Sequence, residues 1–333
     1  EPRFAGEHPT PMQAIQIHTT GSADVLTLLD LPTPTPGPGQ ALIRIEASGV
    51  NFIDIYFREG RYPAQLPYTL GQEAAGIIVA LAPDVTTFKV GDRVAWCLIP
   101  GTYAQLAVAP AARLVHIPDA VNAQQAAAAL LQGMTAHYLT HSTYPIRRGD
   151  EVLIHAGAGG VGLLLTQMAK ALGARVFTTV SNEEKAALSR AAGADETIFY
   201  TQEDFATKVK KLSTGPGLHA VYDSVGKSTF EKSLEVLRPR GTMVLFGGSS
   251  GAVPPFDLIK LSTMGSLYVT RPTLKDYVAT RADLEARAND VLASVAQGTL
   301  KLRLEHTYPL TDAAHAQRDL ESRKTTGKLL LLP

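Results

Sequence analysis

A glycine-rich run between two predicted elements is the part of this sequence whose residue types and spacing most directly indicate chemistry. The run Gly157-Ala158-Gly159-Gly160-Val161-Gly162 follows the apolar residues 152–154 and precedes a long apolar, alanine-rich segment. A GxGxxG pattern alone is weak evidence, but a strand before it and a helix after it are the context of a dinucleotide-binding turn. Gly157 would permit a tight exit from the strand, Gly159 would let backbone approach a pyrophosphate, and Gly162 would let the helix lie close to the sheet.

The N–H groups at the start of the predicted helix have no partners within it and would face the phosphate charge. The residues expected to hold the pyrophosphate are those of the turn: Gly157, Gly159, Gly160, Val161 and Gly162. The alternative is a glycine-rich surface turn without a ligand, which the flanking apolar pattern disfavours.

The next predicted strand, residues 175–180, ends without the acidic residue that NAD-preferring sites usually place beside the adenosine ribose. Ser181 and Asn182 follow instead, and Lys185 lies one helical turn further on. A neutral strand end removes the repulsion that would exclude a 2′-phosphate, and the lysine offers a positive charge. The pattern favours NADPH over NADH, with a merely solvated lysine as the alternative interpretation of Lys185.

Composition limits the classes of partner. The 333 residues include 31 lysines and arginines and 31 acidic residues, so no net charge recruits nucleic acid or an anionic membrane, and small molecules are the expected partners. Cys97 is the single cysteine, which excludes an intramolecular disulfide framework and a multi-cysteine zinc site. No apolar segment approaches the ~20 residues that span a bilayer, so a soluble cytoplasmic protein is expected. Residues 1–11 are polar and are interpreted as a leader or a disordered arm.

Two sequence patterns predict the elements that must position these residues. From residue 12 to about 118, short apolar or alternating runs are separated by Pro and Gly clusters, which predicts a β-rich domain. An alanine-rich helical pattern over 123–138 then leads to the glycine turn, after which strands and helices alternate. The candidate strands span 151–155, 175–180, 197–200, 220–224, 242–246 and 266–270. Six strands with intervening helices predict an α/β, doubly wound parallel sheet.

The tail from Thr273 does not continue that alternation. A helical stretch over 274–297 precedes residues 301–308, a helix near 311–322 and the apolar run 328–332, which has the composition of a buried strand. Strands in the tail need partners outside the completed six-stranded sheet. We therefore expect the tail to return to the first domain, which would make that domain discontinuous and place a cleft between the two domains.

Six segments, in order along the chain, carry a family resemblance: 49–54, 71–76, 155–162, 221–226, 246–251 and 265–272. In these segments the chain resembles the medium-chain dehydrogenase/reductase superfamily and, within it, the zinc-free NADPH-dependent quinone oxidoreductases related to zeta-crystallin. The resemblance implies a GroES-like, β-rich catalytic domain over 12–133 and 272–333, and a Rossmann NADPH-binding domain over 134–271 with a six-stranded parallel sheet.

Departures from the wider superfamily indicate that zinc is not used. Zinc alcohol dehydrogenases of this architecture carry a Cys where Asn51 stands and a His where Gln72 stands, and they hold a second, structural zinc with four cysteines. Neutral amides are poor zinc ligands, so no metal is expected. His137 and His141 are spaced i, i+4, but without a nearby carboxylate in the sequence they are not taken as a metal site.

The resemblance also implies a set of cofactor residues. Residues matching Lys185, Tyr200 and Arg323 surround the adenosine 2′-phosphate in the family, and an arginine can bind phosphate in a bidentate manner. The remaining cofactor contacts are expected from strand ends and nearby helices, at Asn51, Thr135, Ser181, Ser224, Val225, Phe246, Gly247, Ser249, Val269 and Thr270. For Phe246 and Val269, ordinary sheet core is the alternative.

The implied reaction is hydride transfer from NADPH to a quinone, with the cofactor carrying most of the chemistry. Asn51 and Tyr62 match residues of the family's substrate cleft, and either could hydrogen-bond an oxygen that gains negative charge. Tyr62 is the candidate proton donor; solvent is the alternative donor, and packing over the ring is the alternative role for Tyr62. Reduction of an enone or alkenal, and non-catalytic NADPH binding, remain alternative functions. A homodimer is expected by resemblance, through the edge strand near 266–270.

Overall fold

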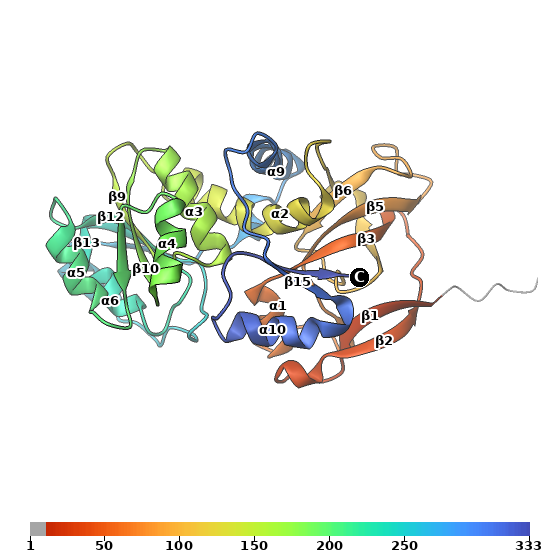
Figure 1. Cartoon of the computed structure of the whole chain (residues 1–333), viewed down its shortest axis with the longest axis horizontal. Helices are drawn as coiled ribbons and strands as arrows, with labels where there is room; N and C mark the ends of the chain where they lie inside the picture. The colour runs from red at the N-terminus through yellow and green to blue at the C-terminus, as the bar shows by residue number, and fades with distance from the viewer. Residues whose placement is uncertain (1–10) are drawn as a thin grey trace, which may run out of the picture. The chain divides into compact units, whose positions relative to one another are not determined.

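The computed structural model describes residues 11–333, which divide into two compact units (Figure 1). Unit 1 comprises the described residues up to 131, with 304–324 and 328–333, and unit 2 comprises 132–303 and 325–327. Of the predicted leader or arm, 1–11, only Pro11 is described, and it begins the first strand; the rest lies outside the described residues. In the part of the chain that the structure describes, no helix is both long and apolar enough to cross a membrane.

Unit 2 is built on the parallel sheet that the sequence predicts. Its strands are β9 (Glu151–Ile154), β10 (Arg175–Val180), β11 (Glu196–Phe199), β12 (Leu218–Asp223), β13 (Leu237–Leu245) and β14 (Tyr268–Thr270). Its helices are α3 (Gly160–Ala171), α4 (Glu183–Ala191), α5 (Phe205–Leu212), α6 (Phe230–Leu234), α7 (Ile259–Thr263), α8 (Leu274–Tyr277) and α9 (Arg281–Ala296), and α2 (Ala123–Tyr138) crosses the boundary with unit 1.

The strand order in this sheet is β11-β10-β9-β12-β13-β14, and every neighbouring pair among these described strands is parallel. Numbered along the chain, the order is 3-2-1-4-5-6, which is the order of the doubly wound dinucleotide-binding fold. The predicted fold class is therefore confirmed. The order reverses between β9 and β12, so the carboxyl ends of these two strands mark the crevice in which such sheets bind ligands.

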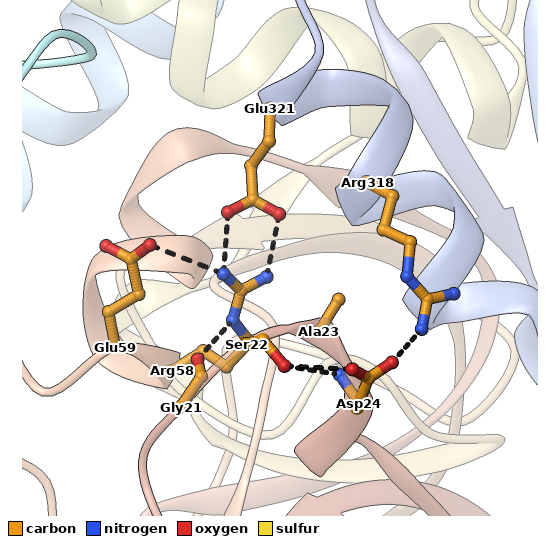
Figure 2. Close-up of a pocket in the computed structure, with 8 residues that line it drawn as sticks. All are labelled: Gly21, Ser22, Ala23, Asp24, Arg58, Glu59, Arg318 and Glu321. Carbon is orange, nitrogen blue, oxygen red and sulfur yellow. Dashed lines mark hydrogen bonds and ion pairs between the residues drawn. The ribbon is translucent and has the colours of Figure 1, made fainter.

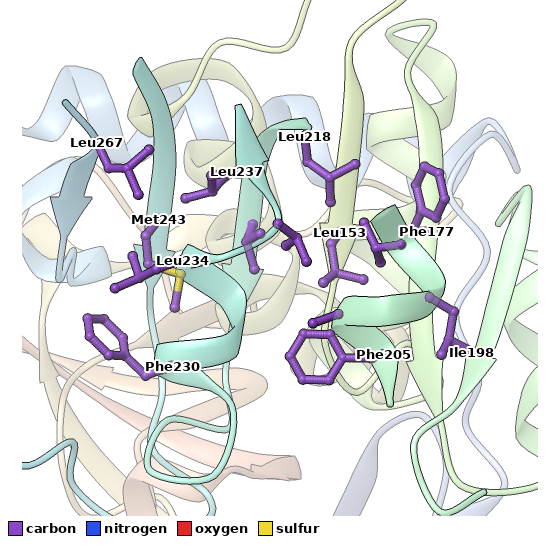
Figure 3. Packing of buried hydrophobic residues seen from close by; sticks show 14 residues of the cluster. Leu153, Phe177, Ile198, Phe205, Leu218, Phe230, Leu234, Leu237, Met243 and Leu267 are labelled. Atoms are coloured by element: carbon purple, nitrogen blue, oxygen red, sulfur yellow. The ribbon is translucent and has the colours of Figure 1, made fainter. Parts of the chain in front are cut away.

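Helices cover both faces of this sheet, and β10 shows why. Successive residues of a strand point to opposite faces. Phe177 packs in the cluster that contains Phe205 of α5 and Phe230 of α6, whereas the next residue, Thr178, hydrogen-bonds Ser189 of α4 at 2.7 Å. Figure 3 shows the apolar cluster beneath α5 and α6. The sheet is thus buried on both faces, as parallel sheets are.

Unit 1 is β-rich. Its elements are β1 (Pro11–Ile17), β2 (Thr27–Pro32), β3 (Gln40–Val50), α1 (Phe52–Arg58), β4 (Tyr68–Thr69), β5 (Glu73–Leu81), β6 (Arg93–Cys97), β7 (Leu106–Pro110), β8 (Val115–His116), β15 (His306–Pro309), α10 (Ala313–Glu321) and β16 (Leu329–Leu332). Two sheets form among the described strands: β2-β1-β4, and β15-β16-β3-β5-β6-β8 with β7 paired to β3.

The carboxyl-terminal strand completes the larger sheet of unit 1. β16 pairs antiparallel with β3, Leu330 opposite Gly49, and parallel with β15. This pairing is the return of the tail that the sequence predicts. Residues 272–303, by contrast, cluster with unit 2, where Val291 of α9 packs against Gly133 of α2. The domain boundaries that the family resemblance implies stay a prediction: 12–133 with 272–333 for one domain, and 134–271 for the other.

The helical stretch expected over 274–297 is two helices. α8 ends at Tyr277, and Thr280 then caps α9, its side-chain oxygen accepting from the Asp283 N–H at 3.1 Å. A threonine with an acidic residue three positions later satisfies the orphan donors of a new helix start. The break follows from this cap, a signal that apolar periodicity alone does not carry.

Candidate functional site

The turn between β9 and α3 leaves no room for a side chain at two positions. Ala156 leaves the strand with a positive φ of 53°, so the tight exit falls on this alanine. A Cβ on Gly157 would lie 2.5 Å from Thr178 Cβ in the neighbouring strand, and a Cβ on Gly162 would lie 2.2 Å from the carbonyl oxygen of Ala156. Both distances are far below van der Waals contact, so these glycines allow strand and helix to pack closely.

The amino-terminal end of α3 has no side-chain cap, and its near neighbours are the Gln132 amide beside Gly160 and Gly327 beside Gly159. Gly159 precedes the helix in extended conformation, and no side chain caps its first turn, where Gly160 and Val161 lie. A Cβ on Gly159 would approach only the Ala156 carbonyl oxygen, at 3.2 Å, so this glycine is not required by packing as Gly162 is. Uncapped N–H groups and the positive end of the helix dipole suit a pyrophosphate.

Ser181, Lys185 and Tyr200 gather at the ends of two neighbouring strands. The Tyr200 N–H donates to the carbonyl of the last β10 residue at 3.2 Å, and Thr201 Oγ1 donates to the Ser181 carbonyl at 3.0 Å. The Asn182 side-chain oxygen caps α4 by accepting from the Lys185 N–H at 2.9 Å. With Tyr200 46% exposed and no acid at the strand end, the arrangement suits a ribose that carries a phosphate.

The third residue predicted for the 2′-phosphate, Arg323, lies in unit 1. It follows α10 with a positive φ of 57°. Ser181, Lys185 and Tyr200 are therefore brought together within unit 2, and the participation of Arg323 stays a prediction.

Asp223, buried at the end of β12, organises the loops that follow β12 and β13. Its Oδ1 accepts from the Val225 N–H at 2.7 Å, and its carbonyl oxygen accepts from the Phe246 N–H at 2.8 Å. A Cβ on Gly247 would lie 2.7 Å from the Ser224 carbonyl oxygen, so the two loops touch. Five predicted cofactor residues are thereby brought together at adjoining strand ends: Ser224, Val225, Phe246, Gly247 and Ser249.

The remaining predicted residues of unit 2 lie on β14 and α2. Val269 and Thr270 pair in register with β13, and Val269 is 38% exposed because β14 is the edge of the sheet. Thr135 lies on α2 and is buried. Neither Phe246 nor Val269 is fully buried, which is a departure from ordinary sheet core.

In unit 1, Asn51 is held by a buried ion pair. Lys328 Nζ donates to Asn51 Oδ1 at 2.7 Å and to Glu73 Oε2 at 2.5 Å, while Asn51 Nδ2 donates to the same Glu73 oxygen at 2.9 Å and to the Gly49 carbonyl at 3.4 Å. Asn51, Glu73 and Lys328 are all at most 4% exposed. Both amide hydrogens of Asn51 are thus directed at protein acceptors, which leaves this side chain suited to holding its neighbours in place.

A buried carboxyl lies next to this group. Asp54 Oδ2 accepts from the Asn51 N–H and from the Tyr103 hydroxyl, each at 2.9 Å, while Asp54 Oδ1 has no hydrogen-bond partner among the described residues. Burial raises the pKa of the Asp54 carboxyl to about 7, against the lowering effect of those hydrogen bonds. Asp54 therefore titrates near neutral pH, unlike an exposed aspartate.

Tyr62 belongs to an aromatic cluster. Its ring makes edge contacts with Tyr56 and Phe57, both with centroids 5.5 Å away, and Phe57 lies equally close to Tyr68. No residue in the described part of the chain hydrogen-bonds the Tyr62 hydroxyl. Gln72 Nε2 donates to the Tyr68 hydroxyl oxygen at 2.8 Å. The structure thus supports the packing role of Tyr62 and leaves its hydroxyl available.

Metal-ligand geometry is not found in the part of the chain that the structure describes: no group of three or more His, Cys, Asp or Glu could hold an ion. His137 and His141 stack with ring centroids 4.2 Å apart, and the Arg287 guanidinium lies 3.1 Å from His137 Nδ1. Burial, with the neighbouring ring and guanidinium, lowers the pKa of His137 to about 4. That adjacent positive charge opposes a bound cation.

A pocket of about 420 Å³ in unit 1 contains none of the predicted site residues (Figure 2). The Arg58 guanidinium, 1% exposed, donates to Glu321 Oε1 at 2.7 Å and Oε2 at 3.1 Å and to Gln317 Oε1 at 2.7 Å. Arg318 pairs with Asp24 across the opening. The ion pairs Arg58–Glu321 and Arg318–Asp24 balance one another's charges and join α10 to α1 and to the segment around Asp24. We therefore interpret the pocket as structural.

Five residues of these networks are not among the predicted site residues. Asp54, Glu73 and Asp223 lie within the motif segments 49–54, 71–76 and 221–226, and Tyr68 and Lys328 lie outside every such segment. Lys328 carries the clearest signal, since a lysine that opens an apolar strand must either reach solvent or meet a buried acid. Its partner, 255 residues earlier, follows only from the fold.

Comparisons with known proteins cover both units. Residues 37–119 match the family described as "Alcohol dehydrogenase GroES-like domain", and residues 160–292 match the family described as "Zinc-binding dehydrogenase". A quinone oxidoreductase of Pseudomonas aeruginosa is 46% identical over 321 residues, which covers 96% of this chain and 99% of that protein. A 2-haloacrylate reductase of a Burkholderia species is 40% identical over 330 residues, which covers 97% and 99%.

A solved structure agrees with these similarities. The Escherichia coli quinone oxidoreductase complexed with NADPH matches with a TM-score of 0.94 at 41% identity, covering 96% of this chain and all of that chain. Likeness of this extent over nearly the whole length confirms the resemblance seen in the sequence. The chain belongs to the quinone oxidoreductase family of the medium-chain dehydrogenase/reductase superfamily.

Proposed function

We propose that this protein transfers a hydride from NADPH to a quinone. The proposal rests on the ends of two neighbouring strands in unit 2. Behind β9, the uncapped start of α3 follows Gly159, and behind β10 a strand end without an acidic residue lies near Lys185 and Tyr200. The first suits a pyrophosphate and the second a 2′-phosphate. The acceptor is inferred from the relatives named quinone oxidoreductase.

NADPH, when bound, supplies the hydride and its two electrons. The chain's own residues bind and orient it. The N–H groups of Gly160 and Val161 would contact the pyrophosphate, and Lys185 and Tyr200 the 2′-phosphate, with Arg323 as a further predicted contact. The loops organised by Asp223 would border the ribose and nicotinamide. Thr135, Val269 and Thr270 are proposed to lie alongside the ring.

The substrate side is proposed to lie in unit 1, at Tyr62 and Asn51. A Tyr62 hydroxyl without a partner among the described residues can donate to an oxygen that gains negative charge. Asn51 keeps a place in the site, but its amide hydrogens face Glu73 and Gly49, so its proposed role is to hold the substrate cleft in shape.

Reduction of an α,β-unsaturated carbonyl compound is the second candidate, favoured by the 2-haloacrylate reductase relative. Non-catalytic NADPH binding is the third. Steady-state assays with NADPH and NADH against an ortho-quinone, a para-quinone and a simple enone separate the three. We expect turnover with NADPH and a quinone. A strong preference for the enone would support the second candidate, and tight NADPH binding without oxidation by any acceptor would support the third.

We also propose that the reaction needs no zinc and that the protein is a cytoplasmic homodimer. The zinc proposal rests on Asn51 and Gln72, whose amides are already engaged by Lys328 and Tyr68. Activity that survives EDTA, with less than about one zinc per ten chains by elemental analysis, would support it.

The dimer proposal rests on the edge strand β14, where Tyr268 is 62% exposed. Sedimentation at micromolar concentration tests it.

A further inference from the structure

Tyr68 stands out among the polar side chains of unit 1 because its hydroxyl is oriented by a buried amide. It begins the two-residue strand β4, paired with β1 at Ile17, and its half-buried ring packs on Phe57. Gln72, 4% exposed, donates from Nε2 to the Tyr68 hydroxyl oxygen at 2.8 Å. The oxygen therefore acts as acceptor in this contact, and its own proton is left to donate elsewhere.

No residue in the described range 11–333 accepts that proton. The other nearby donors are already used within the protein: Asn51 Nδ2 donates to Glu73, and the Tyr103 hydroxyl donates to Asp54. A phenol that accepts one hydrogen bond becomes a stronger donor of the next, because hydrogen-bonded chains polarise one another. Of the three hydroxyls of Tyr62, Tyr68 and Tyr103, those of Tyr62 and Tyr68 have a proton to offer a ligand.

The two tyrosines are arranged about one ring. Tyr62 and Tyr68 each lie 5.5 Å from Phe57, centroid to centroid. Burial, and to a lesser extent the Asp54 carboxylate, raise the pKa of Tyr68 to about 12. The phenol stays protonated at every pH at which the protein would work. It is also a poor acid toward a reduced quinone oxygen, so its chemical use is to donate a hydrogen bond, not to give up its proton.

We propose that Tyr68, oriented by Gln72, donates a hydrogen bond to the substrate carbonyl oxygen as that oxygen gains negative charge, and is therefore a further catalytic residue. The inference rests on the proposed function. NADPH would give up a hydride with both electrons of its nicotinamide C–H bond and would become NADP⁺, while the substrate gains the new bond to hydrogen and is reduced. The negative charge left on the substrate oxygen would be stabilised by the Tyr68 O–H. The proton that finally neutralises this oxygen comes from Tyr62 or solvent, so Tyr68 starts and ends the cycle as a phenol.

The first test is Tyr68→Phe, which keeps the ring on Phe57 and removes only the hydroxyl. Loss of one such donor typically lowers kcat by about 100-fold, and we expect a loss of that order with a quinone, with the Kd for NADPH unchanged within about twofold. Tyr308→Phe is the matched control. Its hydroxyl donates to Asp319 at 2.7 Å elsewhere in unit 1, and its removal is expected to leave kcat unchanged.

The second test reverses the direction of the orienting hydrogen bond. Gln72→Glu puts a carboxylate beside Tyr68, which would accept the phenol proton and withdraw it from the substrate. We expect Gln72→Glu to lower kcat about as much as Tyr68→Phe, and the double variant to be no slower than either. Independent, additive losses would contradict an orienting role for Gln72.

The outcomes separate this inference from the proposed function. Wild-type protein that binds NADPH but reduces no acceptor would overturn both. Wild-type protein that reduces quinones, with a Tyr68→Phe variant whose kcat is within twofold of it, would overturn the role of Tyr68 and leave the proposed function standing. A folded Tyr68→Phe variant with normal NADPH binding and a strongly lowered kcat would support it.

Discussion

At the scale of single residues, we expect side-chain charge to select the cofactor and burial to set how the protein responds to pH. Lys185 illustrates the first. Its N–H group is fixed by the Asn182 cap, so the side chain starts from a defined place beside Ser181 and Tyr200. A lysine on an exposed helix has no function by default. What changes that expectation is the neutral strand end, where Ser181 and Asn182 stand in place of the usual acid.

Lys185→Ala should therefore raise the KM for NADPH by about tenfold and leave the KM for NADH unchanged within about twofold. A hydrogen bond to a charged group contributes roughly 1.5–3 kcal/mol, and ~1.4 kcal/mol corresponds to a factor of ten in binding. Steady-state kinetics with both cofactors measures the ratio. Lys211→Ala, which removes an exposed lysine from α5, serves as the control, and an equal rise for both cofactors would contradict a phosphate contact.

Asp54 illustrates the response to pH. Its pKa is about 7 in the folded protein and has a reference value of 3.8, so the folded state binds the proton more tightly than the unfolded state. The stabilisation from this proton is fully present below pH 3.8 and is lost as pH rises to about 7. Asp54→Asn removes the titration while its side-chain oxygen can still accept from Asn51 and Tyr103.

We expect the free energy of unfolding of Asp54→Asn, relative to wild type, to rise between pH 5 and pH 7 by about 1.4 kcal/mol per pH unit. The single tryptophan, Trp96, is fully buried in unit 1, so its fluorescence during urea unfolding reports on this unit. If wild type and variant changed in parallel with pH, Asp54 would not be the titrating group.

At the scale of elements, the same residue type performs different tasks within one turn. Gly162 is needed because an added Cβ would lie 2.2 Å from the Ala156 carbonyl oxygen, whereas a Cβ on Gly159 would lie 3.2 Å from the same oxygen, and Gly159 precedes an uncapped helix start. A glycine required by packing and a glycine required by a ligand can therefore be distinguished from the neighbours that an added Cβ would meet.

This difference predicts that replacing glycine by alanine has different effects at positions 162 and 159. Gly162→Ala should lower the thermal midpoint by several degrees, because the new methyl overlaps backbone that cannot move aside cheaply. Gly159→Ala should leave the midpoint within about two degrees while weakening NADPH binding at least tenfold. Thermal unfolding without cofactor and NADPH titration by fluorescence measure the two effects. Unchanged NADPH affinity in Gly159→Ala would contradict the proposed pyrophosphate site.

Much of the element scale could be predicted because its signals are local. The six strands of the parallel sheet and the helix over 123–138 follow from apolar runs and alanine periodicity. The break at Thr280 did not, because a cap is a single residue within an otherwise helical pattern. The glycine turn was predicted as a unit, but the positive φ at Ala156 depends on how β9 and α3 pack.

At the scale of the whole molecule, the features that sequence could not supply are contacts between distant segments. Asn51 was predicted as a site residue, but its partner Lys328 lies 277 residues away, brought close because β16 pairs with β3. The hydrogen bond from Gln72 to Tyr68 spans only four residues, yet it depends on a half-buried phenol that no periodicity marks. Candidate residues could therefore be named in advance, whereas their hydrogen-bond directions could not.

The contribution of one such long-range contact to stability can be measured at the Lys328–Glu73 ion pair. Removing one member of a buried ion pair leaves an uncompensated charge and typically costs about 3–5 kcal/mol, whereas replacing both members costs far less. Lys328→Met should therefore destabilise unit 1 by roughly that amount, because Glu73 is fully buried and also accepts from the Leu131 N–H at 2.6 Å. Glu73→Gln keeps an oxygen for only one of these two donors, the Leu131 N–H or Asn51 Nδ2, and it leaves the Lys328 ammonium without a carboxylate.

We expect the double variant Lys328→Met, Glu73→Gln to be more stable than Lys328→Met alone, with a coupling energy well above 1 kcal/mol. Urea unfolding followed by Trp96 fluorescence at one protein concentration measures the cycle without interference from any assembly of chains. Additive losses would mean that the two side chains are not coupled. A large coupling would show that the last strand is held to the rest of unit 1 by the Lys328–Glu73 ion pair as well as by backbone pairing.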